Sequence, residues 1–203
     1  MKNILLVLLI ALGLSLCNLS ERFKGNSKSG PSASGGSSRT VETAKATAEQ
    51  TAALAGGQEK KWDRQGMSWT IPPNWTEETN ESKMFTMRSP GGGNAASLIV
   101  NISPMDESFP ADIQPWFDQA EGRAKNGEVD EVKFVEIDGL KGVQFREASP
   151  EKPDGHRRLQ WMAYRKYTGQ LQLVSVMLAS EGKDFERHKN AMYGILYSMK
   201  VAH

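Results

Sequence analysis

The stretch RRLQWMAYRKYTGQLQLVSVML, residues 157–178, decides the fold class. In its first half, Leu159, Trp161 and Ala163 alternate with mostly polar side chains, so they lie on one face of a β-strand. Thr168-Gly169 suits a tight turn, and the residues after it again favour a strand. The stretch therefore predicts an antiparallel β-hairpin.

Further strands are predicted upstream of this hairpin. Each is a short alternating or apolar segment, and Gly, Pro or Asn residues separate it from the next. These strands are expected at residues 66–71, 83–89, 96–103, 132–137 and 143–145.

Two helices are predicted from apolar residues at helical spacing. The first begins with Asp112 as its N-cap and ends at Asn126-Gly127, and the second begins with Asp184. Each helix carries one apolar stripe, so both are expected to cover the same face of the sheet. The element order predicts an α+β fold, in which an antiparallel β-sheet of six to seven strands is covered by two helices.

The first 17 residues are predicted to be an export signal. Lys2 is followed by the uncharged run ILLVLLIALGLSL, which is shorter than the ~20 apolar residues that cross a bilayer. Residues 14–17, Leu-Ser-Leu-Cys, resemble the lipobox of bacterial lipoproteins, which implies a lipid on Cys17. Leu16 stands where that family usually has Gly, Ala or Ser. Cleavage without lipidation and an uncleaved anchor therefore remain alternatives.

The rest of the chain divides by composition. Residues 18–58 are rich in Ser, Gly, Ala and Thr, and are predicted to be a flexible linker. All the Trp and Tyr residues lie in 59–203, which is expected to form one domain around one core. The formal net charge is only +1, and 59–203 is slightly acidic by itself. This balance argues against a nucleic-acid partner.

Three segments carry a family resemblance. They are Trp69-Thr70-Ile71-Pro72-Pro73-Asn74-Trp75, Ile137-Asp138-Gly139, and Phe185 together with Ile195-Leu196-Tyr197-Ser198-Met199. In these segments, the region from Trp62 to Val201 resembles the PsbP-like family, which includes bacterial DcrB-like lipoproteins. Asn74 replaces a common glycine, and asparagine tolerates the left-handed backbone that the turn needs. The resemblance implies the fold and leaves the function open.

Candidate site residues lie on and beside the strand at 157–167. The sequence has no H-E-x-x-H, no G-x-S-x-G and no P-loop, and no metal or cofactor is expected. Arg158, Gln160, Tyr164 and Lys166 are predicted to share an open polar face, which Met162 interrupts as an interface centre would. We expect Arg157, Arg158 and Tyr164 to be accessible and to bind a partner. A merely solvated face is the alternative.

The sequence as a whole favours an exported, membrane-tethered protein of the cell envelope that acts as a non-catalytic binding module. Its expected partners are the membrane, through a lipid on Cys17, and an unidentified envelope protein. The alternatives are a structural or stress-response role, and an enzyme with a distributed site. The enzyme would need His156 or His188 in a pocket beside a carboxylate.

Overall fold

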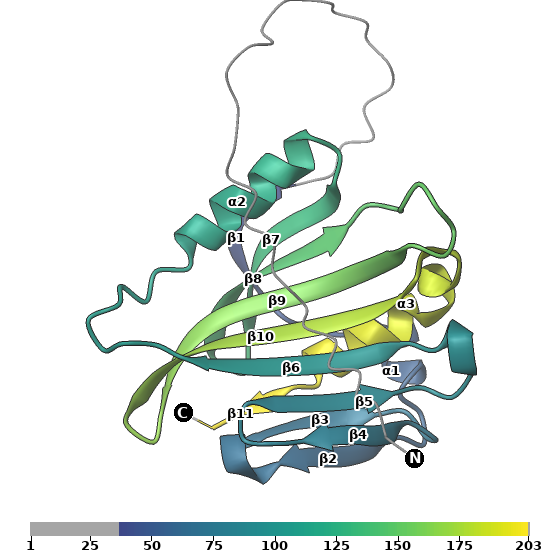
Figure 1. Cartoon of the computed structure of the whole chain (residues 1–203), viewed down its shortest axis with the longest axis horizontal. Helices are drawn as coiled ribbons and strands as arrows, with labels where there is room; N and C mark the ends of the chain where they lie inside the picture. Colours follow the sequence, from purple (N-terminus) through teal and green to yellow (C-terminus); the bar gives the residue numbers. More distant parts are fainter. Residues whose placement is uncertain (1–36, 203) are drawn as a thin grey trace, which may run out of the picture. The chain divides into compact units, whose positions relative to one another are not determined.

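The computed structural model describes residues 37–202, which form two β-sheets and three α-helices (Figure 1). The strands are β1 (Ser37–Thr43), β2 (Gln58–Trp62), β3 (Met67–Ile71), β4 (Thr76–Asn80), β5 (Met84–Arg88), β6 (Ser97–Pro104), β7 (Val129–Ile137), β8 (Leu140–Glu147), β9 (His156–Tyr167), β10 (Gln170–Glu181) and β11 (Lys200–Val201). The helices are α1 (Ala48–Ala52), α2 (Gln114–Lys125) and α3 (Gly182–Tyr197). The predicted α+β class is confirmed, with more strands than expected.

The larger sheet has eight strands in the order β1-β7-β8-β9-β10-β6-β5-β4, and the smaller sheet has three in the order β11-β3-β2. All neighbouring strands of both sheets are antiparallel except β1 and β7, which are parallel. The larger sheet is therefore mixed, and the expected wholly antiparallel sheet is wrong at this one edge.

The predicted hairpin is the centre of the larger sheet. β9 and β10 pair from His156 to Tyr167, and Thr168 and Gly169 make the turn with φ of 49° and 82°. Asp138 and Gly139 join β7 to β8 with φ of 49° and 81°. Positive φ at both central residues is the geometry that matches the twist of two hairpin strands.

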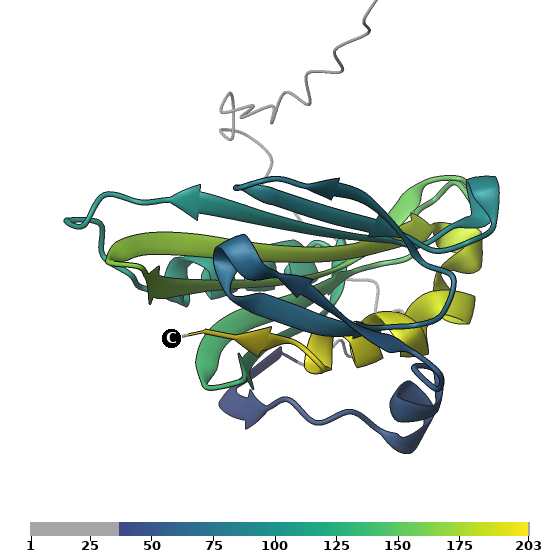
Figure 2. The ribbon, with the colours of Figure 1, turned by 90° about the horizontal axis from the view of Figure 1, so that it is seen from below.

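The two long helices lie on opposite faces of the larger sheet, so the expectation that both cover one face is wrong. α3 and the smaller sheet pack together on one side of the larger sheet (Figure 2). α2 packs on the other side, against β7 and β8. β7 carries apolar side chains on both faces. In β7, Val132 and Phe134 face α2, while Val135 and Ile137 join the α3 core.

Large aromatic side chains fill the core on the α3 side. Trp62, Trp69 and Trp161 have no exposed surface. The ring of Trp69 stacks on Phe85 at 5.3 Å between centroids, and Trp161 donates a hydrogen bond of 3.1 Å to the carbonyl oxygen of Val135. Buried indoles are stable when their polar N–H finds a partner, so Trp161 fixes β9 against β7 across the intervening strand.

Part of the predicted linker belongs to the fold. β1 pairs with β7, and α1 begins with a capping box in which Thr47 and Gln50 satisfy each other's backbone N–H groups. The domain boundary expected at residue 59 is therefore wrong for residues 37–58. Small residues in this segment suggested a chain without a core, but backbone pairing at a sheet edge needs no large side chain. The predicted signal 1–17, with Cys17, and linker residues 18–36 lie outside the described residues.

Two predicted helix caps differ in detail. The N-cap of α2 is Ile113 and not Asp112, although the Asp112 carboxylate accepts a hydrogen bond of 2.9 Å from the backbone N–H of Gln114. Asp184 lies inside the first turn of α3, two residues after the helix begins, and pairs with Arg187 at 3.2 Å. Within residues 37–202 no helix is long and apolar enough to cross a membrane.

Candidate functional site

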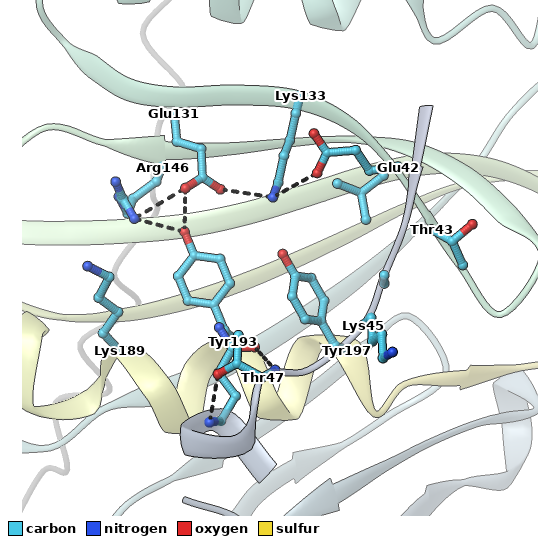
Figure 3. Close-up of a pocket in the computed structure, with 13 residues that line it drawn as sticks. Glu42, Thr43, Lys45, Thr47, Glu131, Lys133, Arg146, Lys189, Tyr193 and Tyr197 are labelled. Carbon is cyan, nitrogen blue, oxygen red and sulfur yellow. Dashed lines mark hydrogen bonds and ion pairs between the residues drawn. The ribbon is translucent and has the colours of Figure 1, made fainter. Parts of the chain in front are cut away.

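A pocket of about 310 Å³ lies between the larger sheet, α3 and the segment that contains β1 and α1 (Figure 3). We call it the polar pocket. Most of its wall consists of charged, hydroxyl and amide side chains. The lining residues are Glu42, Thr43, Ala44, Lys45, Thr47, Gln50, Glu131, Lys133, Val135, Arg146, Lys189, Tyr193 and Tyr197.

Glu131 is the centre of the bonding network in this pocket. Its carboxylate accepts hydrogen bonds from the Tyr193 hydroxyl at 3.0 Å and from the Gln144 amide at 2.5 Å. It also pairs with Arg146 at 3.3 Å and with Lys133 at 3.8 Å. Three elements, β7, β8 and α3, therefore meet at one carboxylate, and the side chains around it are held in place.

Two cations of the sheet are held in their charged form. Burial alone would lower the pKa of Lys133, but Tyr197, Glu131 and Glu42 together outweigh it and raise that pKa. The same balance raises the pKa of Arg146, through Tyr193, Asp130 and Glu131. Both side chains are therefore permanent positive charges at neutral pH.

The two tyrosines of α3 point from the helix toward the sheet, side by side (Figure 3). Burial, with Glu131 next in importance, raises the pKa of Tyr193 well above its ordinary range. Burial also raises the pKa of Tyr197, although Lys133 opposes this. Both hydroxyls stay protonated at neutral pH, so they act as hydrogen-bond donors and acceptors.

Arg157 is not accessible, and this prediction is wrong. Only 5% of the residue is exposed. Its guanidinium binds Asp130, Glu186 at 2.9 Å and the carbonyl oxygen of Glu147 at 2.8 Å, and lies over the Phe185 ring at 4.5 Å. Arg157 has the parity of Leu159 and Trp161 along β9, so its side chain points to the face that α3 covers.

Arg158 and Tyr164 share the opposite face, as predicted, and both are partly exposed. The side chain of Arg158 is 39% exposed and binds both carboxylate oxygens of Glu147, at 3.0 and 3.2 Å. Arg158 and Tyr164 are six positions apart along the strand, roughly 20 Å. The structure therefore does not bring the three predicted residues together.

The face around Tyr164 is not an open polar surface, because α2 and the loop before it cover it. Met162, expected to be exposed, is 8% exposed and packs against the α2 side core. Beside it lies a second pocket of about 340 Å³, which we call the aromatic groove. It is lined by Phe109, Pro110, Asp112, Pro115, Trp116, Gln119 and Tyr164.

The aromatic groove has a defined geometry. The Trp116 indole donates a hydrogen bond of 3.0 Å to the Tyr164 hydroxyl, and the Phe109 ring lies 5.7 Å from the Tyr164 ring. Phe109 is 39% exposed, which is unusual for a phenylalanine. A neighbouring hollow of about 350 Å³, lined by Ala111, Ile113, Leu140 and Lys141, continues from Asp112 and Tyr164. Tyr164 is thus the predicted site residue that the structure does place in a pocket.

No sequence pattern predicts the polar pocket, because its parts are far apart in the chain. Glu42, Glu131, Arg146 and Tyr193 come from four different elements. A partial signal existed in β7, where Glu131 and Lys133 occupy positions that alternate with Val132 and would otherwise face the core. Buried-facing charges on a strand indicate a polar cluster.

The two histidines proposed for an enzyme do not line any of these pockets. His156 is exposed at the start of β9, and His188 lies beside Arg187 on α3, at 3.2 Å between side-chain nitrogens. Among residues 37–202, no group of three or more His, Cys, Asp or Glu side chains is placed to hold a metal ion.

No protein-family model and no curated protein matches the sequence. Several solved structures match the fold. LpqN of Mycobacterium tuberculosis, described as involved in cell envelope biogenesis, is 11% identical with a TM-score of 0.52 over 72% of this chain and 86% of LpqN. The cyanobacterial PsbP of Synechocystis sp. PCC 6803 is 12% identical with a TM-score of 0.49, over 71% of this chain and 92% of that protein.

The α+β fold predicted from the sequence is shared with LpqN. Identities of 11 and 12% carry no statement about a ligand, a partner or a reaction. The function must therefore be argued from the two pockets of this chain.

Proposed function

We propose that this protein is an exported, non-catalytic binding module of the bacterial cell envelope, tethered to a membrane through a lipid on Cys17. It captures a segment of an envelope protein in the aromatic groove. The observation that carries the proposal is the exposed ring of Phe109 beside Trp116 and Tyr164. Aromatic side chains are enriched in protein interfaces and among the residues that contribute most of the binding energy.

The rigid apolar rings of the groove favour an apolar or aromatic side chain of the partner. Trp116 and Tyr164 are fixed to each other, so they present rigid apolar surface at little cost in conformational entropy. An apolar or aromatic side chain of the partner would fill the hollow between them and Phe109. Burying such a side chain contributes about 1.5–3 kcal/mol.

The negative charge beside the groove favours basic residues next to the side chain that the partner inserts. The loop before α2 and the start of that helix carry no basic residue from position 105 to 122, and their exposed carboxylates are those of Asp106, Glu107, Asp112 and Asp118. Complementary charge steers association and suppresses wrong partners. The occupant is therefore a segment in which an apolar anchor is flanked by lysine or arginine.

The position of the protein in the envelope is supported by two separate observations. The signal-like run before Cys17 favours export. The fold is shared with LpqN, a protein described as involved in cell envelope biogenesis. Neither bears on the identity of the partner.

The competing proposal of a distributed active site has less support. It required His156 or His188 beside a carboxylate in a pocket, and neither residue lines the pockets described above. The polar pocket contains two carboxylates, but Glu131 is held by four neighbours and by no histidine.

The test uses short synthetic peptides in which an aromatic residue is flanked by lysines, with glutamate-flanked versions for comparison. Binding to the full chain in non-ionic detergent is measured by calorimetry. The lysine peptides should bind, and the Phe109→Ala variant should weaken them about tenfold, or about 1.4 kcal/mol. Met84→Ala is the matched control, since Met84 is 37% exposed on β5 and lines neither pocket.

Equal binding of the glutamate peptides would contradict the charge argument. Equal loss in the Phe109 and Met84 variants would contradict the groove. In cells, a photo-crosslinking residue at position 109 should give a specific product that Asp112→Asn and Asp118→Asn weaken, and one at position 84 should not.

A further inference from the structure

We propose that the polar pocket binds the oxyanion group, carboxylate or phosphate, of a small molecule. This site is separate from the aromatic groove. Glu131 and Lys133 point to the α3 side of the sheet, and Tyr164 points to the α2 side. The two proposals therefore stand or fall independently.

The polar pocket is larger than a single ion or water molecule requires. Its volume of about 310 Å³ is far above the ~10–15 Å³ that one water molecule requires. The polar side chains leave this space open even though three elements converge on it. The pocket therefore has room for a molecule and not merely for one ion.

The charged side chains that line the pocket carry a net positive charge. Four cationic side chains line the pocket, Lys45, Lys133, Arg146 and Lys189, against the carboxylates Glu42 and Glu131. The neighbours Asp130, Glu186 and Arg157 are bonded to this group. With them included, the cations still outnumber the carboxylates by one, so an anion would complete the balance.

Both carboxylates of the pocket already have bonding partners, whereas some of its cationic groups do not. Glu131 accepts hydrogen bonds from Tyr193 and Gln144 and pairs with Arg146 and Lys133, as described above. Glu42 pairs with Lys133 at 3.3 Å. Within residues 37–202, Lys45 has no ion pair. Arg146 uses Nε for Asp130 and Nη1 for Tyr193 and Glu131, which leaves Nη2 without a described partner.

The positive charges of Arg146 and Lys133 on the sheet are permanent and poorly screened by solvent. The side chains of Arg146 and Lys133 are 16% and 22% exposed. The raised pKa of each keeps it protonated at neutral pH. Charges partly removed from water act more strongly on an approaching anion than charges in full solvent do.

Guanidinium and ammonium groups bind carboxylate and phosphate oxygens through short, charge-assisted hydrogen bonds. Arg146 would contribute from the sheet, Lys189 from α3, and Lys45 from the segment between β1 and α1. The Tyr193 and Tyr197 rings form an apolar wall for the remainder of the molecule. An oxyanion bound here would therefore contact all three elements.

The experiment measures binding of sodium phosphate and sodium acetate to the full chain in non-ionic detergent, by calorimetry at constant ionic strength set with chloride. The test variant is Lys45→Gln with Lys189→Gln. The matched control is Lys125→Gln with Lys183→Gln, which removes the same charge from exposed positions outside the pocket. The parent and the control should bind alike within about twofold, while the test variant should lose about tenfold, or about 1.4 kcal/mol.

A second variant guards against effects on folding. Arg146→Lys keeps the charge but removes the planar fork, so it should weaken phosphate binding while circular dichroism stays unchanged. Mixed detergent micelles that contain phosphatidylglycerol or phosphatidylcholine separate the sources of the anion. Competition with phosphate by phosphatidylglycerol alone assigns a lipid headgroup, and no competition assigns a soluble molecule.

The proposal is overturned if the parent shows no saturable binding of phosphate or acetate. It is also overturned if the control loses as much affinity as the test variant, because the effect would then belong to net charge and not to the pocket. Loss of peptide binding at the aromatic groove would leave this result unchanged.

Discussion

The indole Nε1 of Trp116 donates a hydrogen bond of 3.0 Å to the Tyr164 hydroxyl, which joins α2 to the middle of β9. This bond closes one side of the aromatic groove and orients both rings. The partly buried indole N–H depends on this hydroxyl, so the pair links the stability of α2 to the shape of the groove.

Tyr164→Phe should lower the free energy of unfolding by about 1 kcal/mol, because a partly buried indole N–H loses its hydrogen bond. Urea denaturation followed by circular dichroism measures this. Tyr164→Ala should cost more, since it also removes the ring that contacts Phe109. An unchanged midpoint in Tyr164→Phe would show that water replaces the hydroxyl.

Arg157→Ala should lower the free energy of unfolding by about 3 kcal/mol, because it removes a buried guanidinium that binds Asp130, Glu186 and the carbonyl oxygen of Glu147. Arg158→Ala is the matched control on the next residue of the same strand. Its partly exposed ion pair with Glu147 is worth at most about 1 kcal/mol. Equal losses in the two variants would contradict the burial of Arg157.

Glu186 predicts a pH dependence of stability. Burial alone would raise its pKa, but Lys189 and Arg157 outweigh burial and hold the pKa below its ordinary value. A lowered pKa in the folded state stabilises the protein above the unfolded pKa of about 4.3, and this contribution is lost as the pH falls through the lower folded value. Parent and Glu186→Gln should therefore differ at pH 7 and converge below about pH 4.

Urea denaturation of both proteins across this pH range checks the prediction. Glu107→Gln is the control, since none of the residues from 37 to 202 pairs with Glu107. A difference between parent and Glu186→Gln that stays constant down to pH 3 would show that the bonds to Lys189 and Arg157 do not contribute.

Gly142→Ala should destabilise the fold by about 1–3 kcal/mol through overpacking. A β-carbon at this position would lie 2.5 Å from the Trp161 ring and 2.6 Å from the carbonyl oxygen of Met162. Gly122→Ala in α2 is the control. A β-carbon there meets nothing within 4 Å, and alanine in a helix is worth about 1 kcal/mol more than glycine. Thermal melts of the two variants should therefore shift in opposite directions.

Cys17→Ala should release the protein from the membrane or block its maturation, because the acyl chains that would anchor it cannot be attached. A sodium carbonate wash followed by immunoblotting of the pellet and supernatant measures this. Full retention in the pellet would favour the uncleaved anchor.

The fold was predictable wherever one face of an element is apolar and the other polar. The hairpin at 157–178 and the turns at Asp138-Gly139 and Asn74 follow from local patterns, and the structure agrees. The faces of β7 were not predictable in the same way. A strand that is apolar on both sides does not indicate which helix covers which side, so α2 was assigned to the wrong face.

The candidate site was predictable only in part. Tyr164 stood out because it alternates with core residues on β9. Arg157 alternates in register with those core residues, but a basic side chain at the end of a strand is ordinarily solvated. The polar pocket could not be found from the sequence, because Glu42 and Glu131 come together only when the parallel pairing of β1 and β7 is known.

That pairing has a consequence for proteolysis. β1 occupies the edge of the larger sheet, so the backbone groups on that side of β7 are covered by residues 37–43. A protease that cut between residues 44 and 57 would leave β1 held only by its pairing with β7 and by the ion pairs of Arg39 and Glu42. Loss of the strand would expose β7 as a free edge. A free edge pairs readily with other strands. The nicked protein would then recruit the β1 of another copy, so a trimmed population would exchange strands and associate.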